Sequence, residues 1–421
     1  MKKLLSDGTF YYSGDFDLTS RLQDRSLSLE DFDIDSFDPG FMWNSHMIGA
    51  LLQFRSHLGD EERGRLDHAG FLTCVIRGFV ESLTIQRPTA RMESRSRAFG
   101  LPARLTLISR LSCRRAGTRF NARGIDDDGN VANFVETETV IWNPSSGNPA
   151  RAVAFSYCQI RGSIPIFWEQ QTGILPNQQK IHITRSPEAT QPAFDRHIEG
   201  LLLKYGSAHI VDLLSETKSG EVELSTRYSE HTSRVCGRGN DKNIRALLRS
   251  TAYDFHAQTK GPTGYEAASQ IRMIVEDSSD AFGYLLIEGT SEGEDDPKGS
   301  FVVVLQQEGV FRTNCLDCLD RTNLVQGILS KAAVEAFLQQ RAEVVGHGFW
   351  MQHSTLWADN GDVSPPANLP QQQLMGMKMI GTLEDLRRHR RPQVEFHQDG
   401  EDESFRGFRR CPEKCNACVY Q

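Results

Sequence analysis

The part of the sequence that most constrains the fold is a strand–loop–helix unit toward its C-terminal end. The apolar run Gly299–Leu305 is typical of a buried strand and leads toward a polar loop at Phe311–Asn323. Apolar residues then recur every three or four positions, as one face of a helix requires: Leu324, Val325, Ile328, Leu329, Ala332, Phe337 and Leu338. A unit of this kind predicts an α/β (α+β) fold, with a mixed sheet flanked by helices.

The rest of the chain also alternates between strand and helix patterns. We expect a helix at Ser45–Gln53 and a strand-like run at Gly70–Leu83. A β-rich stretch follows, interrupted by turn-forming residues such as Asp126–Asn130. Its expected strands are Leu105–Leu111, Phe134–Trp142, Arg151–Ile160 and Ile164–Trp168. Helices are expected again at Ala193–Lys204 and Lys242–Arg249.

Composition sets the broad class of protein. A chain of 421 residues has room for two or three domains with a sizeable core. No run approaches the roughly 18 apolar residues of a membrane span, and the N-terminus turns polar at Ser6, so we expect neither a transmembrane segment nor a signal peptide. Nine cysteines without a regular framework suit a reducing compartment. We therefore expect a cytoplasmic protein that meets membranes from their cytosolic face.

The charge is unevenly distributed. A net charge of -8 argues against a general nucleic-acid binder. Between Arg87 and Arg123, however, the sequence has ten arginines and one acidic residue, Glu93. Such a run predicts one face that meets an anionic partner, either a phosphorylated substrate or a lipid surface. The alternative is a set of solvated faces and structural ion pairs, and composition does not separate the two.

The polar loop contains a cysteine and an arginine at a spacing suited to phosphate chemistry, Cys315 and Arg321. Between a strand and a helix, such a loop turns backbone N–H groups inward, and the helix adds its positive end, so the two form a cup for a tetrahedral anion. The cup favours the thiolate of Cys315, and Arg321 can grip the phosphate with a bidentate fork. The other expected substrate-binding residues of this loop are Asn314, Leu316, Cys318, Leu319, Asp320, Thr322 and Asn323.

These residues predict a two-step phosphatase reaction. Cys315 attacks phosphorus while an acid protonates the leaving oxygen, and water then hydrolyses the cysteinyl-phosphate. No metal cofactor is needed, because the arginine and the backbone dipoles carry the phosphate charge. Asp317 is the preferred acid and Asp320 is assigned a structural role. In the alternative, both carboxylates point away from the phosphate and accept from backbone or arginine donors.

Other interpretations of the cysteines stay open. Cys315 and Cys318 have the spacing of a redox pair or of half a zinc site, although the two neighbouring acids oppose the first and no nearby residues complete the second. A reversible disulfide between them would shield the nucleophile from overoxidation, or Cys318 is simply a small buried side chain. Near the C-terminus Cys411, Cys415 and Cys418 give a weak zinc signal.

The segment Arg312–Asn323 resembles the signature of the Sac-domain phosphoinositide phosphatases. The resemblance extends over roughly residues 5–365 and is closest to fungal synaptojanin-like members. It includes the blocks Ala116–Arg119, Arg123–Gly124, Gly129–Glu138, Gln159–Pro165, Tyr253–His256 and Leu356–Asp362. The resemblance implies a metal-free enzyme that removes inositol-ring phosphates from singly phosphorylated phosphoinositides and from the 3,5-bisphosphate. In it Cys315 would be the nucleophile and Arg321 the phosphate binder.

The resemblance also suggests how the chain is divided. Residues 1–100 would be a partial N-terminal subdomain, residues 101–364 the catalytic domain, and residues 365–421 an irregular, disordered tail. The chain departs from the family pattern after Asp362, where the family continues into a glycine-rich stretch with a lysine. The second hypothesis is therefore a truncated phosphoinositide-binding or scaffolding protein with little turnover. Tyrosine phosphatase activity is compatible with the loop alone and is disfavoured by the surrounding blocks.

Overall fold

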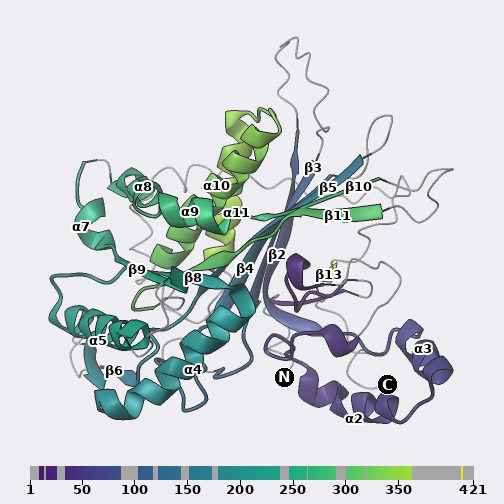
Figure 1. The fold of residues 1–421 in the computed structure, drawn as a ribbon, viewed down its shortest axis with the longest axis horizontal. Helices are drawn as coiled ribbons and strands as arrows, with labels where there is room; N and C mark the ends of the chain where they lie inside the picture. Colours follow the sequence, from purple (N-terminus) through teal and green to yellow (C-terminus); the bar gives the residue numbers. More distant parts are fainter. Residues whose placement is uncertain are drawn as a thin grey trace.

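The centre of the structure is one large mixed sheet flanked by helices (Figure 1). The computed structural model describes residues 9–13, 16–25, 34–86, 103–116, 122–143, 151–172, 179–237, 246–262, 264–290, 300–317, 320–362 and 409–410. Within these residues the expected α/β architecture is confirmed. The sheet continues from β2 to β3 and so crosses the domain boundary placed at residue 100; the division of the chain into domains stays a prediction.

The strand order of the sheet is β13–β1–β2–β3–β4–β5–β12–β8–β9, and β10 pairs with both β5 and β11. Strands β2 to β5 pair in antiparallel fashion, whereas β5, β12, β8 and β9 run parallel to one another. The strands are β1 Phe10–Tyr12, β2 Val75–Ile85, β3 Ala103–Leu111, β4 Val135–Asn143, β5 Arg151–Arg161, β8 Ser207–Asp212, β9 Leu248–Ala252, β10 Leu285–Thr290, β11 Ser300–Leu305, β12 Gly309–Asn314 and β13 Arg409–Arg410. A separate ribbon joins β6 Trp168–Thr172 to β7 Gln179–Ile183.

Helices cover both faces of this sheet. The longer ones are α2 Ser45–Ser56, α3 Asp60–His68, α4 Pro187–Tyr205, α5 Ser219–Gly237, α10 Asp320–Gln340 and α11 His347–Asp362. The short ones are η1 Leu22–Asp24, η2 Ile34–Ser36, α7 Phe255–Thr259, η3 Gly264–Gln270, α8 Ile271–Ile274 and α9 Glu276–Phe282. In Figure 1, α2 and α3 lie together at one end, away from α4, α5 and the α7–α11 group.

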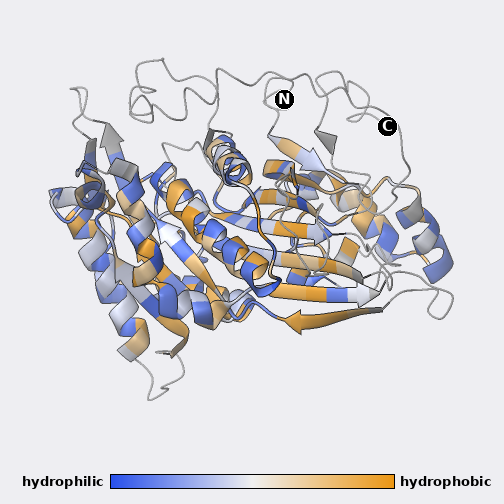
Figure 2. Cartoon of the chain, turned by 90° about the horizontal axis from the view of Figure 1, so that it is seen from above, coloured by the Kyte–Doolittle hydropathy of each residue, from blue (hydrophilic) through white to orange (hydrophobic). Residues whose placement is uncertain are grey.

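Two hydrophobic clusters hold these layers together. One packs α10 and α11 on β3, β4 and β5, through residues such as Leu105, Leu107 and Phe155. The other packs α4 and α5 on β5, β8 and β12, through residues such as Ile160 and Ile210. Successive side chains of a strand point to opposite faces, so a sheet covered on both sides reads as a nearly continuous apolar run. Figure 2 shows this pattern as largely hydrophobic strands between helices with mixed faces.

Most of the expected elements are confirmed, and four expectations need correction. The strand expected at Ile164–Trp168 is wrong except for Trp168, which begins β6. Ile166 N donates to Ile164 O at 2.9 Å across Pro165, which has no N–H for a sheet ladder. The run Gly299–Leu305 does contain β11, but β11 does not lead into the cysteine loop; β12 lies between them.

The helix expected at Lys242–Arg249 is confirmed only in part: of its described residues, Ala246 and Leu247 are helical and the last two are not. Leu248 and Arg249 begin β9, which pairs with β8 in parallel register. Leu248 is buried in the cluster under α4 and α5, so the gain from completing the sheet edge overrides the local helical pattern. The strand expected from Gly70 begins only at Val75.

A fully buried ion cluster connects the N-terminal segment to the sheet. Arg110 of β3 pairs with Glu136 and Glu138 of the neighbouring β4, and all three side chains have 0% exposure. Arg110 also donates to the carbonyl oxygens of Leu18 and Ser20, at 2.5 and 2.9 Å. The arginine run of the sequence therefore includes at least one structural ion pair rather than only a surface patch.

The two glutamates also accept three further hydrogen bonds. Tyr205 of α4 donates to Glu136 at 2.6 Å, and Ser156 of β5 donates to Glu138 at 2.6 Å. The backbone N–H of Leu22 donates to Glu138 at 2.8 Å. Because buried charges are tolerated only when they are paired and hydrogen-bonded, the cluster fixes how β3, β4, β5, α4 and the N-terminal segment fit together.

Removing one charge from this cluster should destabilise the fold. We expect Glu136→Gln to lower the free energy of unfolding by about 3 kcal/mol or more, because part of the charge on Arg110 is left uncompensated in the interior. Urea unfolding measures the change, with the exposed Glu199→Gln of α4 as the matched control. An equal, small effect of both substitutions would contradict the structural role of the cluster.

The same cluster predicts the sign of a pH effect. Burial raises the pKa of Glu136, but Lys204, Arg110 and Arg21 outweigh it and bring the pKa from 4.5 to about 2. A depressed pKa in the folded state contributes stability above pH 4.5 that is lost as the pH falls toward 2. The difference in unfolding free energy between the wild type and Glu136→Gln should therefore shrink across that window. A difference that stays constant from pH 5 to pH 2 would contradict this assignment.

Candidate active site

The candidate site lies where four parallel strands end. Arg161, Asn314, Asp212 and Ala252 are the last residues of β5, β12, β8 and β9, and the registers place them along one edge of the sheet. Loops that leave the carboxyl ends of parallel strands converge on a common crevice. Helix α10 begins at Asp320, so its positive N-terminal end lies just beyond the loop that follows β12. The loop does lie between a strand and a helix, but the strand is β12 and not the predicted run Gly299–Leu305.

Cys315 lies at the base of this arrangement. It directly follows β12, every residue of which is buried, and its own exposure is 1%. Arg321 is in the first turn of α10, on the other side of the loop. Cys318 and Leu319, two of the expected substrate-binding residues, lie outside the described part of the chain.

The residues before Cys315 form a buried polar support. The side-chain amide of Asn314 donates to Asp212 Oδ1 at 2.7 Å, and its main-chain oxygen accepts from Leu213 N at 2.9 Å. Arg312 donates to the carbonyl oxygen of Ser163 at 2.7 Å. These contacts join the ends of β12, β8 and β5, so Cys315 starts from a rigid position.

A neutral histidine completes this support. Arg312 Nε donates to His197 Nε2 at 3.1 Å, so Nε2 must be an acceptor and Nδ1 carries the proton. Nδ1 can then donate to the carbonyl oxygen of Gly129, 3.0 Å away. Burial and the nearby Arg312 charge hold the pKa of His197 well below its ordinary value. His197 therefore supports the charge of Arg312 without adding a second positive charge.

Arg321 is held by groups that the sequence did not reveal. Its Nη1 is 3.5 Å from the carbonyl oxygen of Leu213 and 3.6 Å from Glu221 Oε2. Lys218 Nζ lies 3.2 Å from the other oxygen of Glu221 and donates to His256 Nε2 at 3.0 Å. Burial, with the charges of Arg321 and Lys218, lowers the pKa of His256. The site therefore has a cationic rim of Arg321 and Lys218, bridged by one carboxylate.

These neighbours are about 100 residues from Arg321 in sequence, so no spacing could have indicated Glu221 or Lys218. His256 belongs to the block Tyr253–His256 that carried part of the family resemblance, but it was given no role. Its place beside the site follows from the parallel pairing of β9 with β8, where an α-helix had been expected.

Asp317 takes one of its two predicted arrangements. Its Oδ1 accepts from Arg123 Nη2 at 2.9 Å, and Arg123 also donates to Gln170 Oε1 at 3.1 Å. The carboxylate thus faces an arginine donor, and the Arg123 side chain is almost completely buried. Arg123 comes from the arginine-rich run, which therefore supplies part of the loop's support.

The remaining expected substrate-binding residues differ in how exposed their side chains are. Leu316 packs against the cluster under α4 and α5, Asp320 is exposed at the start of α10, and Thr322 is fully buried. Asn323 is buried as well. Its Oδ1 accepts from Arg161 at 3.2 Å and from Asn360 at 2.8 Å, while its amide donates to the carbonyl oxygen of Trp357. Its polar groups thus join α10 to β5 and α11.

Comparison with known proteins identifies the family. The family model described as the SacI homology domain matches residues 1–260. The chain belongs to the SacI homology domain family. The matched residues end before the cysteine loop, so the loop's role depends on its own residues and on the relatives described next.

Three relatives of this SacI homology domain protein show how far the similarity extends. The chain is 43% identical over 363 residues to "Inositol-1,4,5-trisphosphate 5-phosphatase 1" of Schizosaccharomyces pombe, and 42% identical over 368 residues to "Polyphosphatidylinositol phosphatase INP53" of Saccharomyces cerevisiae. Each alignment covers 86% of this chain and 30% of the relative. "Phosphatidylinositol-3-phosphatase SAC1-B" of Danio rerio is 32% identical over 375 residues, with 86% and 55% covered. The fungal synaptojanin-like resemblance is confirmed, and the chain spans about a third of the length of these two fungal relatives.

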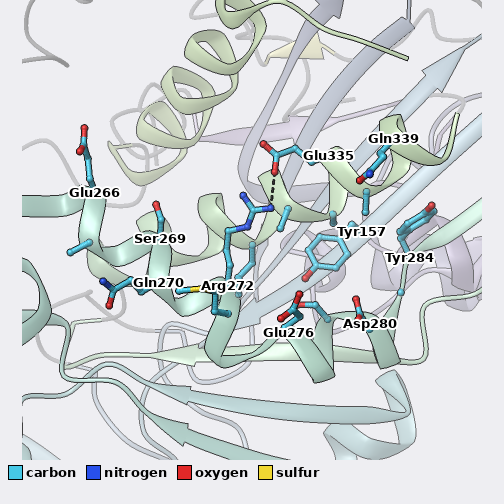
Figure 3. Close-up of a pocket in the computed structure, with 18 residues that line it drawn as sticks. Tyr157, Glu266, Ser269, Gln270, Arg272, Glu276, Asp280, Tyr284, Glu335 and Gln339 are labelled. Carbon is cyan, nitrogen blue, oxygen red and sulfur yellow. Dashed lines mark ion pairs between the residues drawn. The ribbon is translucent and has the colours of Figure 1, made fainter. Parts of the chain in front are cut away.

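The SacI homology domain protein also has a large groove away from the cysteine loop, and its chemistry differs from that of the loop. A groove of about 870 Å³ runs between α10 and the η3–α8–α9 segment. Figure 3 shows Glu276 and Asp280 on one wall and Glu335 on the other, with Arg272 reaching across to Glu335 at 2.7 Å. Its lining includes no residue of the cysteine loop, and its carboxylates oppose an anionic ligand. This groove is therefore poorly suited to a phosphate group.

Within the described residues no group of three or more His, Cys, Asp or Glu side chains is placed to hold a metal ion. Cys411, Cys415 and Cys418 lie outside that part of the chain. Among the helices in the described ranges, none is long and apolar enough to cross a bilayer.

The contacts of Asn323 predict a structural cost on substitution. We expect Asn323→Ala to lower the free energy of unfolding by about 2 kcal/mol, because Arg161 and Asn360 lose a buried acceptor. Urea unfolding measures this, with the exposed Gln339→Ala of the same helix as control. An unchanged unfolding free energy together with a raised KM would instead support the substrate-binding role predicted from the sequence.

Proposed function

We propose that the chain is a phosphoinositide phosphatase that hydrolyses phosphate monoesters of the inositol ring through a cysteinyl-phosphate. The observation that carries the proposal is the Cys315–Arg321 loop, set between the ends of four parallel strands and the start of α10. The proposed substrates are phosphatidylinositol 4-phosphate, 3-phosphate and 3,5-bisphosphate, met on cytosolic membrane faces. The names of the relatives support this class of substrate, since each is a phosphatase of an inositol phosphate or a phosphatidylinositol phosphate.

The reaction needs two displacements at phosphorus. In the first, the Cys315 thiolate forms an S–P bond as the P–O bond to the inositol ring breaks, and a proton passes to the leaving ring oxygen. In the second, water attacks phosphorus, the S–P bond breaks, and inorganic phosphate leaves with the thiolate restored. The proton released by water returns to the acid that gave one in the first step. Atoms and charge balance over the cycle without any redox partner.

Positive groups around the loop suit the charge on the transferred phosphoryl group. The guanidinium of Arg321 is proposed to bind the equatorial phosphate oxygens, with the N-terminal end of α10 on the same side. Lys218 Nζ lies 3.2 Å from the Glu221 carboxylate that also faces Arg321, and the Lys218 side chain is more than half exposed. A substrate with several negative charges is therefore met by an electropositive rim on a protein of net charge -8.

Asp317 remains the proposed acid. Because Asp317 is paired with Arg123, it can act as an acid only if that ion pair is weakened first. The ion pair is made with the charged carboxylate, whereas an acid must carry a proton before it can give one. The incoming phosphate would therefore have to draw Arg123 away from Asp317 or share it. If the pair persists during turnover, Asp317 acts through Arg123 as part of the loop's support.

Loss of the nucleophile tests the proposed reaction. With short-chain phosphatidylinositol 4-phosphate, we expect Cys315→Ser to release phosphate at least about a thousandfold more slowly than the wild type. Cys113→Ser, in the turn after β3 where the thiol donates to the carbonyl oxygen of Pro39, should keep wild-type activity. Release that is unchanged in Cys315→Ser would contradict the covalent mechanism. Lipid binding without any release by the folded wild type would favour the scaffolding alternative.

The role of Asp317 can be tested by changing the leaving group. An acid matters most for a poor leaving group such as an inositol hydroxyl, and least for p-nitrophenol. We expect Asp317→Asn to lower kcat for the lipid substrate by about 100-fold while leaving kcat for p-nitrophenyl phosphate within a few-fold of wild type. An equal loss of kcat with both substrates would instead show that Asp317 acts by holding Arg123. Gln170→Ala removes another hydrogen-bond acceptor of Arg123 and is the matched variant for that case.

A further inference from the structure

A buried carboxylate beside a phosphate-binding loop needs an explanation, because its charge opposes the substrate. Glu221 lies in the first turn of α5, and its side chain is only 5% exposed. It is not part of any motif in the sequence, and the proposed two-step reaction does not use it. Its neighbours show what its charge does.

The two oxygens of Glu221 have different partners. Oε2 accepts from the backbone N–H of Ser215 at 2.8 Å and faces Arg321 Nη1 at 3.6 Å. Oε1 accepts from Lys218 Nζ at 3.2 Å. One carboxylate therefore touches the arginine of the loop, a lysine of the rim and the segment that links them.

The same segment is also tied to the base of the loop. Leu213 N donates to the main-chain oxygen of Asn314, the residue before Cys315, and Leu213 O faces Arg321 at 3.5 Å. The backbone at Ser215 continues this segment from the end of β8 and is fixed by Glu221. The positions of Cys315 and Arg321 therefore both depend on one short stretch of chain, and Glu221 binds the far end of that stretch.

We propose that Glu221 is a positioning residue that holds the guanidinium of Arg321, and with it the ammonium of Lys218, in the place where they meet the substrate phosphate. This inference rests on the proposed function and adds a residue to it. An arginine side chain has many rotamers, and fixing one of them before the substrate arrives removes an entropic cost from the reaction. Two cations and one N–H offset the single negative charge, so the rim keeps a net positive charge toward the substrate.

The first test compares two substitutions on the same helix. Glu221→Gln keeps the size of the side chain and removes its charge, and the exposed Glu223→Gln, two positions further along α5, is the matched control. We expect Glu221→Gln to lower kcat/KM for phosphatidylinositol 4-phosphate by about 10- to 100-fold, as a misplaced catalytic group does, with its thermal midpoint close to that of the control. Activity equal to that of Glu223→Gln would overturn the inference.

A double-mutant cycle separates positioning from general structural support. If Glu221 acts through Arg321, Glu221→Gln should change single-turnover rates less than about twofold in an Arg321→Ala background. The same fold loss in both backgrounds would show that Glu221 acts independently of Arg321 and would overturn the proposal. Glu221→Asp keeps the charge on a shorter side chain and should recover part of the lost activity.

Anion binding distinguishes failure of this inference from failure of the proposed function. Tungstate, a tetrahedral dianion, should bind the wild type at least about tenfold more tightly than Glu221→Gln, whether or not the chain turns over lipid. A wild type that binds tungstate in this way but releases no phosphate would contradict the proposed function and support the role of Glu221. Equal tungstate affinity of the two proteins would overturn the role of Glu221 and leave the proposed function standing if the wild type is active.

Discussion

The buried pairing of Arg110 with Glu136 and Glu138 is the interaction on which the layout of the molecule depends. Three charges with no exposure are stable only if every one of their donors and acceptors is used, and the partners come from β3, β4, β5, α4 and the N-terminal segment. The cluster therefore sets the N-terminal segment and α4 against one face of the sheet. The opposite face of the same strands packs under α10 through apolar residues such as Leu107 and Phe155, and Gln159 on that face donates to the carbonyl oxygen of Gln326.

Strand β5 connects the buried ion cluster to the candidate site. Its first part pairs with β10 in antiparallel fashion, and its last two residues pair with β12 in parallel. At this change of partner the parallel part of the sheet begins. There β12, β8 and β9 end along the same edge. Buried polar contacts of Arg312 and Asn314 then fix the backbone from which Cys315 leaves the sheet. A rigid scaffold below and a helix N-terminus above suit the binding of a tetrahedral anion.

Around this loop the charges are arranged as pairs rather than as a simple basic patch. Arg123 faces Asp317, and both Arg321 and Lys218 face Glu221. In the function we propose, each carboxylate limits the movement of a cation that would bind the phosphate. A substrate with higher charge can compete with these carboxylates for the same donors, since hydrogen bonds to charged groups are the strongest available. The larger acidic groove along α10 lacks this property and would repel the same substrate.

The sequence by itself determined the mixed α/β class, most strand positions, the helix after the loop and the spacing of Cys315 and Arg321. These features depend on local periodicity and on short separations along the chain, which can be read without a structure. Only the tertiary structure decided that Leu248 begins a strand, that Asp317 meets Arg123 and that Glu221 holds Arg321. These three contacts join residues about 40 to 200 positions apart. No local pattern records such contacts, because their energy comes from burial and charge pairing in the folded chain.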